Sequence, residues 1–321
     1  MKRKMVIVVP GLTQEHSKAI SAAADAHGFI AEVYPDPASA IPFLSNAEII
    51  FGTGAEMARY APVLRWFCTP QAGVNDYLID GLFASKEAVL SNCSGAYGTT
   101  IAEHIVMVTL ELMRRQMEYT EIIYRHEWKR DLPIRSIKNS RITLLGTGDI
   151  GQETAMRLRA FSPAKITGVN RSGRNPKYLF DEIVLQTGLD DVLPETDLLI
   201  MSLPGTKETD HMINQERLRL LPRESFIVNV GRGNSLDQRA LEVMLRSGEL
   251  AGAALDVFDV EPLPPEDSLW SCPRLLITPH TAGYITLAYT VDRTIELFLE
   301  DFENYCADRP LLRQVDRTLG Y

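Results

Sequence analysis

The sequence predicts an α/β protein built from two doubly wound parallel sheets, each in a domain of its own. The chain has 321 residues, which is more than one hydrophobic core usually supports. Short apolar runs typical of strands alternate with helical patterns, and this favours parallel sheets covered on both faces. A long helical pattern at residues 99–117 separates two such series. We therefore predict one domain from residues 1–99 plus 285–321 and a second from residues 100–284, with a cleft between them.

The first domain is expected to hold five strands. Strand-like runs occupy residues 5–9, 31–34, 47–51, 64–68 and 88–91, and a helical pattern occupies residues 14–27. The fourth run is followed by the turn Ala72-Gly73-Val74, at the carboxyl end of a parallel strand. Backbone N–H groups in such a turn can bind a carboxylate. An ordinary turn between a strand and a helix is the alternative.

The pattern at residues 99–117 is interpreted as a helix that connects the two domains. Its apolar residues recur three and four positions apart, as one buried face requires. His104 lies within it and is interpreted as a packed or capping histidine rather than a catalytic one. The polar segment 116–140 contains Pro133 and Trp128 and is interpreted as an arm. Because aromatic side chains are enriched at interfaces, Trp128 is a candidate contact with a second copy of the chain.

The second domain is expected to contain one sheet of six strands. The strand-like runs are residues 142–145, 165–170, 197–201, 225–230, 252–257 and 275–278, with a helix at residues 152–160 after the first run. A helical pattern at residues 288–306 closes the chain. This last helix follows a finished sheet, so we expect it to pack on the first domain.

The first strand of the second domain leads into a glycine-rich turn. Gly146, Gly148 and Gly151 have the G-x-G-x-x-G spacing. The first glycine permits the tight turn, the second lets the backbone approach a pyrophosphate, and the third lets the helix pack on the strand. The N–H groups at the start of the helix favour anions. A strand before, a helix after and a second strand ending about 20 residues later indicate a dinucleotide site; a plain glycine-rich turn is the alternative.

The residues after the second strand indicate which dinucleotide binds. An NAD site places an acidic residue there to bind the ribose 2′-hydroxyl, whereas this chain has Asn170, Arg171, Ser172 and Arg174. Asn170 does not repel a 2′-phosphate, Ser172 can donate to it, and either arginine can bind it through its guanidinium group. We predict a preference for NADP(H) over NAD(H). Solvated arginines in a surface turn are the alternative.

Three residues at successive strand ends form the candidate catalytic set, namely Arg232, Glu261 and His280. The carboxyl ends of parallel strands share one edge, where ligands bind, so the three side chains are expected to converge. Arg232 offers a bidentate group for a carboxylate and a positive charge beside an adjacent carbonyl oxygen. Histidine titrates near neutral pH, as an acid or base in catalysis requires. Glu261 would favour the protonated imidazolium, because an opposite charge stabilises it.

Composition argues against several other classes of protein. The formal net charge is −9 and the sequence pI is about 5.3, which argues against a nucleic-acid surface. The four cysteines lack a C-x-x-C spacing, so neither a zinc site nor a disulfide framework is indicated and no metal is expected. No apolar run approaches the roughly 18 residues that span a bilayer. A cytoplasmic protein without membrane or nucleic-acid partners is expected.

Six motifs at the spacings of one family lie within residues 72–283. They are the glycine-rich turn, Ala102-Glu103-His104, Ser202-Leu203-Pro204 before Thr209, Val230-Gly231-Arg232-Gly233, Asp256-Val257-Phe258 with Glu261-Pro262, and Pro279-His280-Thr281-Ala282-Gly283. Together they closely resemble the D-isomer-specific 2-hydroxyacid dehydrogenases, and in particular the glyoxylate/hydroxypyruvate reductase branch. The resemblance implies a flavodoxin-like substrate domain, a Rossmann dinucleotide-binding domain, and a homodimer formed through residues 99–140.

The resemblance also implies roles for individual residues. Arg232 would bind the substrate carboxylate and carbonyl, His280 would donate the proton during reduction, and Glu261 would orient His280. The turn Ala72-Gly73-Val74 would bind the substrate carboxylate. The cofactor contacts of the family would fall on Thr100, Gly148, Asp149, Ile150, Asn170, Arg171, Ser172, Leu203, Pro204, Thr209, Val230, Gly231, Arg232, Asp256, His280, Ala282 and Gly283.

The expected function is the NADPH-dependent reduction of a small 2-oxo acid to the D-2-hydroxy acid. Reduction is the expected direction because NADP(H) is mostly reduced in the cytoplasm. One alternative is an NAD(P)H-binding sensor or corepressor on the same fold with little turnover. Another is oxidation of a small anion such as formate or phosphite. The residues do not name the substrate side chain, and whether Trp128 reaches the active site of a partner is left open.

Overall fold

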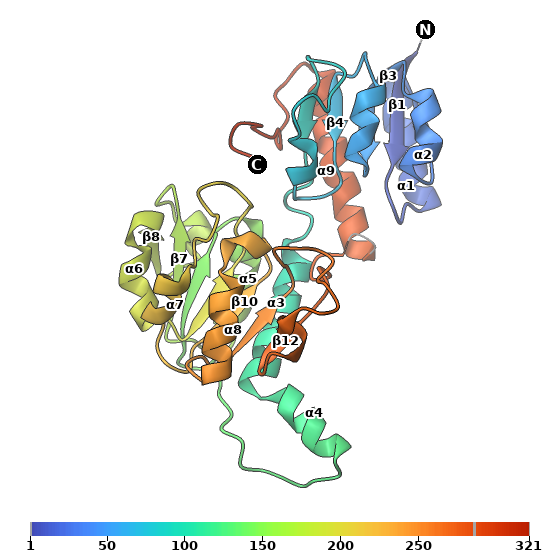
Figure 1. The fold of residues 1–321 in the computed structure, drawn as a ribbon. Helices are drawn as coiled ribbons and strands as arrows, with labels where there is room; N and C mark the ends of the chain where they lie inside the picture. The colour runs from blue at the N-terminus through green and yellow to red at the C-terminus, as the bar shows by residue number, and fades with distance from the viewer. Residues whose placement is uncertain (1, 285–286, 321) are drawn as a thin grey trace. The chain divides into compact units, whose positions relative to one another are not determined.

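The computed structural model describes residues 2–284 and 287–320 and divides into two compact units. The first unit comprises Met1–Tyr97 with Tyr284–Tyr321, and the second comprises Gly98–Gly283. These limits lie within two residues of the predicted domain boundaries. Each unit is built around one parallel sheet (Figure 1). The cleft between the domains stays a prediction.

The sheet of the first unit has the strand order β2-β1-β3-β4-β5, and all of its pairs are parallel. This order is that of flavodoxin-like folds. The strands are β1 (Arg3–Val8), β2 (Phe29–Val33), β3 (Ala47–Gly52), β4 (Trp66–Cys68) and β5 (Val89–Ser91). The five strands expected from the sequence are confirmed.

Both faces of this sheet are covered. Alternate residues of each strand point to opposite sides, so each face contributes its own apolar side chains to packing. One face packs against α2 (Pro37–Ala40) and the loops around it through Val6 and Ile50. On the other face Phe51 and Trp66 stack on Phe298, with ring centroids 3.9 and 5.2 Å away. Phe298 belongs to α9 (Ala288–Cys306), which lies beside α1 (Gln14–Ala26). The prediction that the last helix packs on the first domain is confirmed.

The sheet of the second unit has the order β12-β11-β10-β9-β6-β7-β8 and is parallel throughout. Its order is that of the Rossmann fold with one added strand. The strands are β6 (Arg141–Leu145), β7 (Lys165–Asn170), β8 (Glu182–Leu185), β9 (Leu198–Met201), β10 (Phe226–Asn229), β11 (Gly252–Leu255) and β12 (Leu275–Ile277).

Two groups of helices enclose this second sheet. The helices α3 (Gly98–Met113) and α5 (Asp149–Arg159) pack on each other, and α3 also lies against β10 and β11. A separate apolar core joins the sheet to α6 (Leu189–Val192), α7 (Gln215–Leu220) and α8 (Gln238–Ser247). The strands between them are almost wholly buried, as expected for a parallel sheet covered on both faces.

Two predictions about the second unit were wrong. The sheet has seven strands in the described residues rather than six, because β8 was missed. It is an edge strand of only four residues, none of them fully buried, so it lacks the continuous apolar run of its neighbours. The connecting helix does not continue to residue 117. Arg115 adopts a left-handed conformation with φ of 56°, which ends α3 and starts α4 (Gln116–Tyr124).

The arm consists of α4 and the irregular segment that follows it (Figure 1). The first nine residues of the arm are helical. Only Ile122 of α4 is buried, whereas Tyr124 is 82% and Trp128 is 91% exposed. Among the residues that the structure describes, no helix has the length and apolar character to cross a membrane.

We expect Phe298→Ala to destabilise the first unit by about 3–5 kcal/mol, the range for truncating a buried phenylalanine. The ring is fully buried and stacks on two aromatic side chains. Urea unfolding followed by circular dichroism and tryptophan fluorescence would measure this change. Leu312→Ala is the matched control, since Leu312 is 61% exposed in the same unit; an equal loss in both variants would contradict the assignment of Phe298 to the core.

Candidate active site

The candidate site lies at the carboxyl edge of the seven-stranded sheet. Parallel pairing of β9, β10, β11 and β12 brings the ends of these strands to one edge. The strand order changes direction at β6, which pairs with β7 on one side and β9 on the other. Doubly wound sheets bind ligands in the crevice at this switch point. The predicted site residues of the second unit lie in the loops that leave these strand ends and in the first turns of α3 and α5.

The glycine-rich loop joins β6 to α5 in the way that the sequence predicts. Gly146 has φ of 99°, a conformation that favours glycine. A Cβ atom on Gly151 would collide with the carbonyl oxygen of Gly146, so the helix can approach the strand only because residue 151 is glycine. Gly148 is different, because a Cβ atom there would meet nothing within 4 Å. Packing inside the protein therefore does not explain Gly148.

This loop fits the pyrophosphate of a dinucleotide. Gly148 is the N-cap residue of α5, and no side chain caps the helix. The first N–H groups of an α-helix have no partner within the helix, and an anion can accept from them. The open space at Gly148 would let the ligand approach the backbone. Ile150 lies in this same first turn, and Asp149 starts it.

The loop after β7 is organised by Asn170. Its amide nitrogen donates to Thr147 Oγ1 at 2.8 Å and to the carbonyl oxygen of Arg174 at 2.9 Å. Its carbonyl oxygen accepts from the backbone N–H of Gly173 at 2.7 Å. Asn170 therefore ties this loop to the glycine-rich loop. Arg171, Ser172 and Arg174 are all exposed.

The loop after β9 contains the predicted contacts Leu203, Pro204 and Thr209. The hydroxyl of Thr209 donates to the carbonyl oxygen of Pro204 at 2.7 Å and accepts from the N–H of Thr206 at 2.9 Å. A Cβ atom on Gly231 would lie 2.6 Å from the carbonyl oxygen of Leu203, so a glycine is needed where the loops after β9 and β10 meet.

Arg232 is held through its backbone by a residue that the sequence analysis missed. Asn229 is fully buried at the end of β10. Its amide donates to the carbonyl oxygen of Arg232 at 3.0 Å, and its carbonyl oxygen accepts from the N–H of Gly231 at 3.0 Å. Val230 is buried just before this turn, and the Arg232 side chain is half-buried. The position of Asn229 directly before Val230-Gly231-Arg232 was the available signal.

The structure brings Glu261 and His280 together. His280 Nδ1 lies 2.7 Å from Glu261 Oε2, and Glu261 Oε1 accepts from the backbone N–H of Phe258 at 2.8 Å. The histidine side chain is 51% and the glutamate 35% exposed. Gly233 packs directly against the backbone of Phe258 and Asp259, so the loops that carry Arg232 and Glu261 are in contact. The glutamate therefore fixes one ring nitrogen of His280 and leaves Nε2 for chemistry.

Asp256 holds the backbone of the loop that carries His280. Oδ1 accepts from the N–H of Thr281 at 2.9 Å and Oδ2 from the N–H of Ala282 at 3.0 Å. The carbonyl oxygen of Asp256 accepts from the N–H of His280 at 2.8 Å. His280 has φ of 54°, which turns three successive N–H groups toward this one residue. Gly283, which follows Ala282 in this loop, is half-buried. The predicted cofactor contact Thr100 is also half-buried and lies in the first turn of α3.

The turn Ala72-Gly73-Val74 belongs to the first unit and follows β4. Asn92 donates to the carbonyl oxygen of Ala72 at 2.7 Å, and the N–H of Tyr77 donates to the carbonyl oxygen of Val74 at 2.9 Å. Within the described residues, the N–H groups of Gly73 and Val74 have no hydrogen-bond partner. The turn therefore has the donors that a carboxylate requires, and Asn92 is a bracing residue that sequence reasoning missed.

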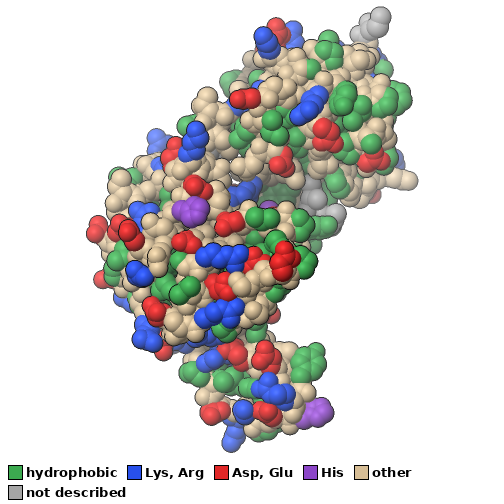
Figure 2. Space-filling model, in the orientation of Figure 1, with side chains coloured by type: hydrophobic (Ala, Val, Ile, Leu, Met, Phe, Trp, Pro, Cys, Tyr) green, Lys and Arg blue, Asp and Glu red, His purple; other side chains and the backbone are tan. Residues whose placement is uncertain are grey.

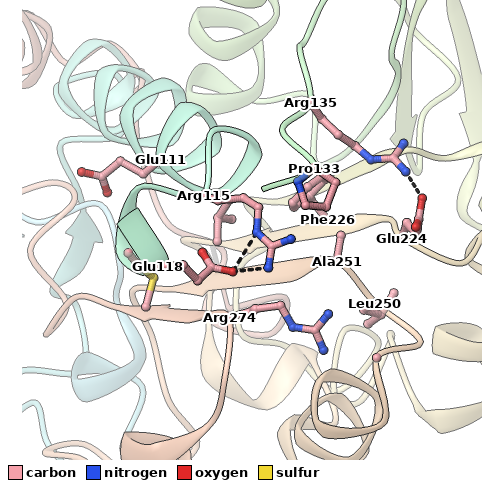
Figure 3. Close-up of a pocket in the computed structure, with 13 residues that line it drawn as sticks. Glu111, Arg115, Glu118, Pro133, Arg135, Glu224, Phe226, Leu250, Ala251 and Arg274 are labelled. Atoms are coloured by element: carbon pink, nitrogen blue, oxygen red, sulfur yellow. Dashed lines mark hydrogen bonds and ion pairs between the residues drawn. The ribbon is translucent and has the colours of Figure 1, made fainter. Parts of the chain in front are cut away.

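The cavity in Figure 3 lies elsewhere in the second unit. It has a volume of about 110 Å³ and is lined by Arg115, Arg135, Phe226 and Ala251 among others. Phe226 starts β10 and Ala251 precedes β11, so this cavity opens at the amino edge of the sheet, opposite the candidate site. Two of its arginines form ion pairs, Arg115 with Glu118 and Arg135 with Glu224 (Figure 3). In the described part of the chain, no group of three or more His, Cys, Asp or Glu side chains could hold a metal ion.

Comparison with known proteins identifies the family. The model of the D-isomer specific 2-hydroxyacid dehydrogenase, NAD binding domain, matches residues 106–282. This range is more than half of the chain and includes the glycine-rich loop, Arg232, Glu261 and His280. The chain belongs to the D-isomer-specific 2-hydroxyacid dehydrogenases, and its second unit is their nicotinamide-dinucleotide-binding domain.

Individual relatives place the similarity in one branch. The chain is 29% identical over 304 residues to glyoxylate/hydroxypyruvate reductase B of Pectobacterium carotovorum subsp. carotovorum, covering 90% of this chain and 94% of that protein. It is 34% identical over 235 residues to glyoxylate reductase of Thermofilum pendens, covering 71% of this chain and 68% of that protein. A solved structure of NADPH-dependent glyoxylate/hydroxypyruvate reductase from Sinorhizobium meliloti, in complex with NADP and sulfate, is 28% identical, with a TM-score of 0.84 and 100% of both chains covered. The resemblance to this branch is confirmed.

The two glycines Gly148 and Gly151 give a matched pair of tests. We expect Gly148→Ala to lower the thermal midpoint only slightly, since alanine is a poorer N-cap residue, but to weaken binding of the nicotinamide dinucleotide about tenfold or more, which is about 1.4 kcal/mol, because the added methyl group would enter the space expected for the ligand. Gly151→Ala should instead destabilise the second unit, since its Cβ collides with Gly146. Thermal unfolding and fluorescence titration measure the two effects. Equal behaviour of the two variants in both measurements would contradict this division of roles.

Proposed function

We propose that this protein is an NADPH-dependent reductase that converts a small 2-oxo acid to the D-2-hydroxy acid. The observation that carries the proposal is the 2.7 Å pair of Glu261 and His280, placed beside the Arg232 loop at the carboxyl edge of a dinucleotide-binding sheet. The relatives named as glyoxylate and hydroxypyruvate reductases support a small 2-oxo acid as the substrate.

The proposed roles follow from the chemistry of each side chain. The nicotinamide, when bound, supplies the hydride. The guanidinium of Arg232 binds the substrate carboxylate in a bidentate manner and polarises the neighbouring carbonyl oxygen. His280 donates the proton to that oxygen from Nε2. Glu261 accepts from Nδ1 and stabilises the imidazolium before it gives up its proton. The N–H groups of Gly73 and Val74 bind the carboxylate from the first domain.

The first test measures oxidation of NADPH and NADH with glyoxylate, hydroxypyruvate, pyruvate, phenylpyruvate and a branched 2-oxo acid. We expect strong turnover of one acid with NADPH. We expect His280→Ala to lower kcat by about 10²–10⁴-fold, the range for losing an acid or base, while NADPH still binds. His211→Ala is the control, since this exposed histidine follows Thr209 in a neighbouring loop.

Two outcomes would contradict the proposal. Near-normal turnover by His280→Ala would remove His280 from the chemistry. Tight NADPH binding without turnover of any acid would favour the alternative function, a nicotinamide-dependent sensor on the same fold.

The proposed preference for NADPH rests on the loop after β7. Asn170 occupies the position of the acidic residue of NAD enzymes and orders the loop by hydrogen bonds, while Arg171 and Arg174 are exposed beside it. The structure of the Sinorhizobium meliloti relative contains NADP, which supports the same preference.

We expect replacement of Arg171 and Arg174 by alanine to raise the KM for NADPH by about tenfold to 100-fold, because hydrogen bonds to a charged group contribute roughly 1.5–3 kcal/mol. The KM for NADH should not change, since NADH lacks the 2′-phosphate. Lys177→Ala removes an exposed charge a few residues further on and should alter neither constant. An equal rise in KM for both cofactors would show that the arginines do not discriminate between them.

We further propose that the chain forms a homodimer through residues 99–140. Hydrophobic and charged side chains lie side by side over the arm (Figure 2), and two of its aromatic residues, Tyr124 and Trp128, are more than four-fifths exposed. Aromatic side chains are enriched at protein interfaces. Replacement of both by serine should reduce the mass measured by analytical ultracentrifugation to that of one 35.9 kDa chain. Tyr178→Ser is the control, because Tyr178 is 91% exposed outside the arm.

A further inference from the structure

A chain of hydrogen bonds links helix α3 to the loop that carries His280. His104 Nε2 lies 3.4 Å from Thr278 Oγ1, and this hydroxyl donates to Asp256 Oδ1 at 2.6 Å. The same carboxylate oxygen accepts from the N–H of Thr281. All of these residues belong to the second unit. Residues 174 positions apart in the sequence are thus joined through one hydroxyl group.

The direction of each hydrogen bond can be assigned from the donors available. Asp256 accepts N–H groups at both carboxylate oxygens, so it acts as the ionised acceptor and the hydroxyl proton of Thr278 points to it. The Thr278 oxygen can then only accept from His104, which must carry its proton on Nε2. Burial lowers the pKa of His104, so the ring is neutral near pH 7 and this single N–H group is the one that the network uses.

Hydrogen bonds support the loop at this point. His280 itself is exposed by about half and adopts a left-handed backbone conformation, so its position depends in part on these bonds. Glu261 fixes its ring, and Asp256 fixes its backbone through three successive N–H groups. The Asp256 carboxylate also accepts from the hydroxyl of Thr278, which His104 contacts.

We propose that His104 is a positioning residue for the reaction and acts on His280 through Thr278 and Asp256. The inference rests on the proposed function, since it concerns the same proton donor. His104 does not touch the substrate. It orients the Thr278 hydroxyl, which directs the Asp256 carboxylate at the N–H groups of residues 281 and 282. Helix α3, the first element of the second unit, thereby sets the position of the imidazole.

The experiment compares variants that remove the hydrogen bond with variants that restore it. His104→Phe and Thr278→Val remove the donor and the hydroxyl while they keep most of the side-chain volume. His104→Gln restores an N–H group, and Thr278→Ser restores the hydroxyl. We expect kcat with NADPH and the preferred 2-oxo acid to fall by about tenfold to 100-fold in the first two variants, since small misplacement of a catalytic group has effects up to about this size. It should recover to within about threefold of wild type in the other two.

A second readout does not depend on turnover. Ring-labelled histidine gives an NMR signal for His280, which can be assigned by its loss in His280→Ala. We expect this signal to shift in His104→Phe and Thr278→Val and to return to the wild-type position in His104→Gln and Thr278→Ser.

The two proposals can fail separately. If wild-type protein reduces no 2-oxo acid, the proposed function fails while the His280 signal still tests the network. If His104→Phe keeps both the wild-type kcat and the wild-type His280 signal, the network does not position His280. If His104→Phe does not fold, the Thr278→Val and Thr278→Ser pair decides the question, and equal signals in these two variants would overturn the inference.

Discussion

The parallel pairing of β9, β10, β11 and β12 is the constraint on which the candidate site depends. Strands that run in the same direction end at the same edge, so the loops after residues 229, 255 and 277 leave the sheet side by side. Arg232, Glu261 and His280 are contributed by these loops although they span 49 positions of the chain, residues 232 to 280. An antiparallel arrangement would send alternate loops to opposite edges and separate the three side chains.

Hydrogen bonds to fixed side chains then hold the loops at this edge. Asn229, Asp256 and Glu261 each accept from backbone N–H groups close by in their own or a neighbouring loop. Asn229 and Asp256 are buried, and a buried polar group must find such partners, because leaving it unpaired costs free energy. The requirement determines loop shape before any ligand binds. Candidate catalytic side chains held in this way would need little rearrangement on binding, which is the condition for efficient use of their charges.

The candidate site contains glycines for two separate physical reasons. Gly151 and Gly231 are needed because a Cβ atom would collide with backbone carbonyl oxygens of the protein itself. Gly148 would collide with nothing in the protein, so packing within the protein does not explain it. Residues of the first kind fix the fold, and residues of the second kind are candidates for ligand contacts. The motif alone does not distinguish them.

The sequence by itself determined the fold class and eleven of the twelve described strands, because apolar runs are local patterns. Strand-end motifs, which are also local, gave the three candidate catalytic residues as a prediction. It missed β8, whose residues are too exposed to form such a pattern, and the break at Arg115, which depends on one backbone conformation. It also gave no sign of the contact between His104 and Thr278. Their hydrogen bond joins positions 174 residues apart. Such a contact has no local signature, since only the packing of α3 against the sheet brings the two side chains within reach.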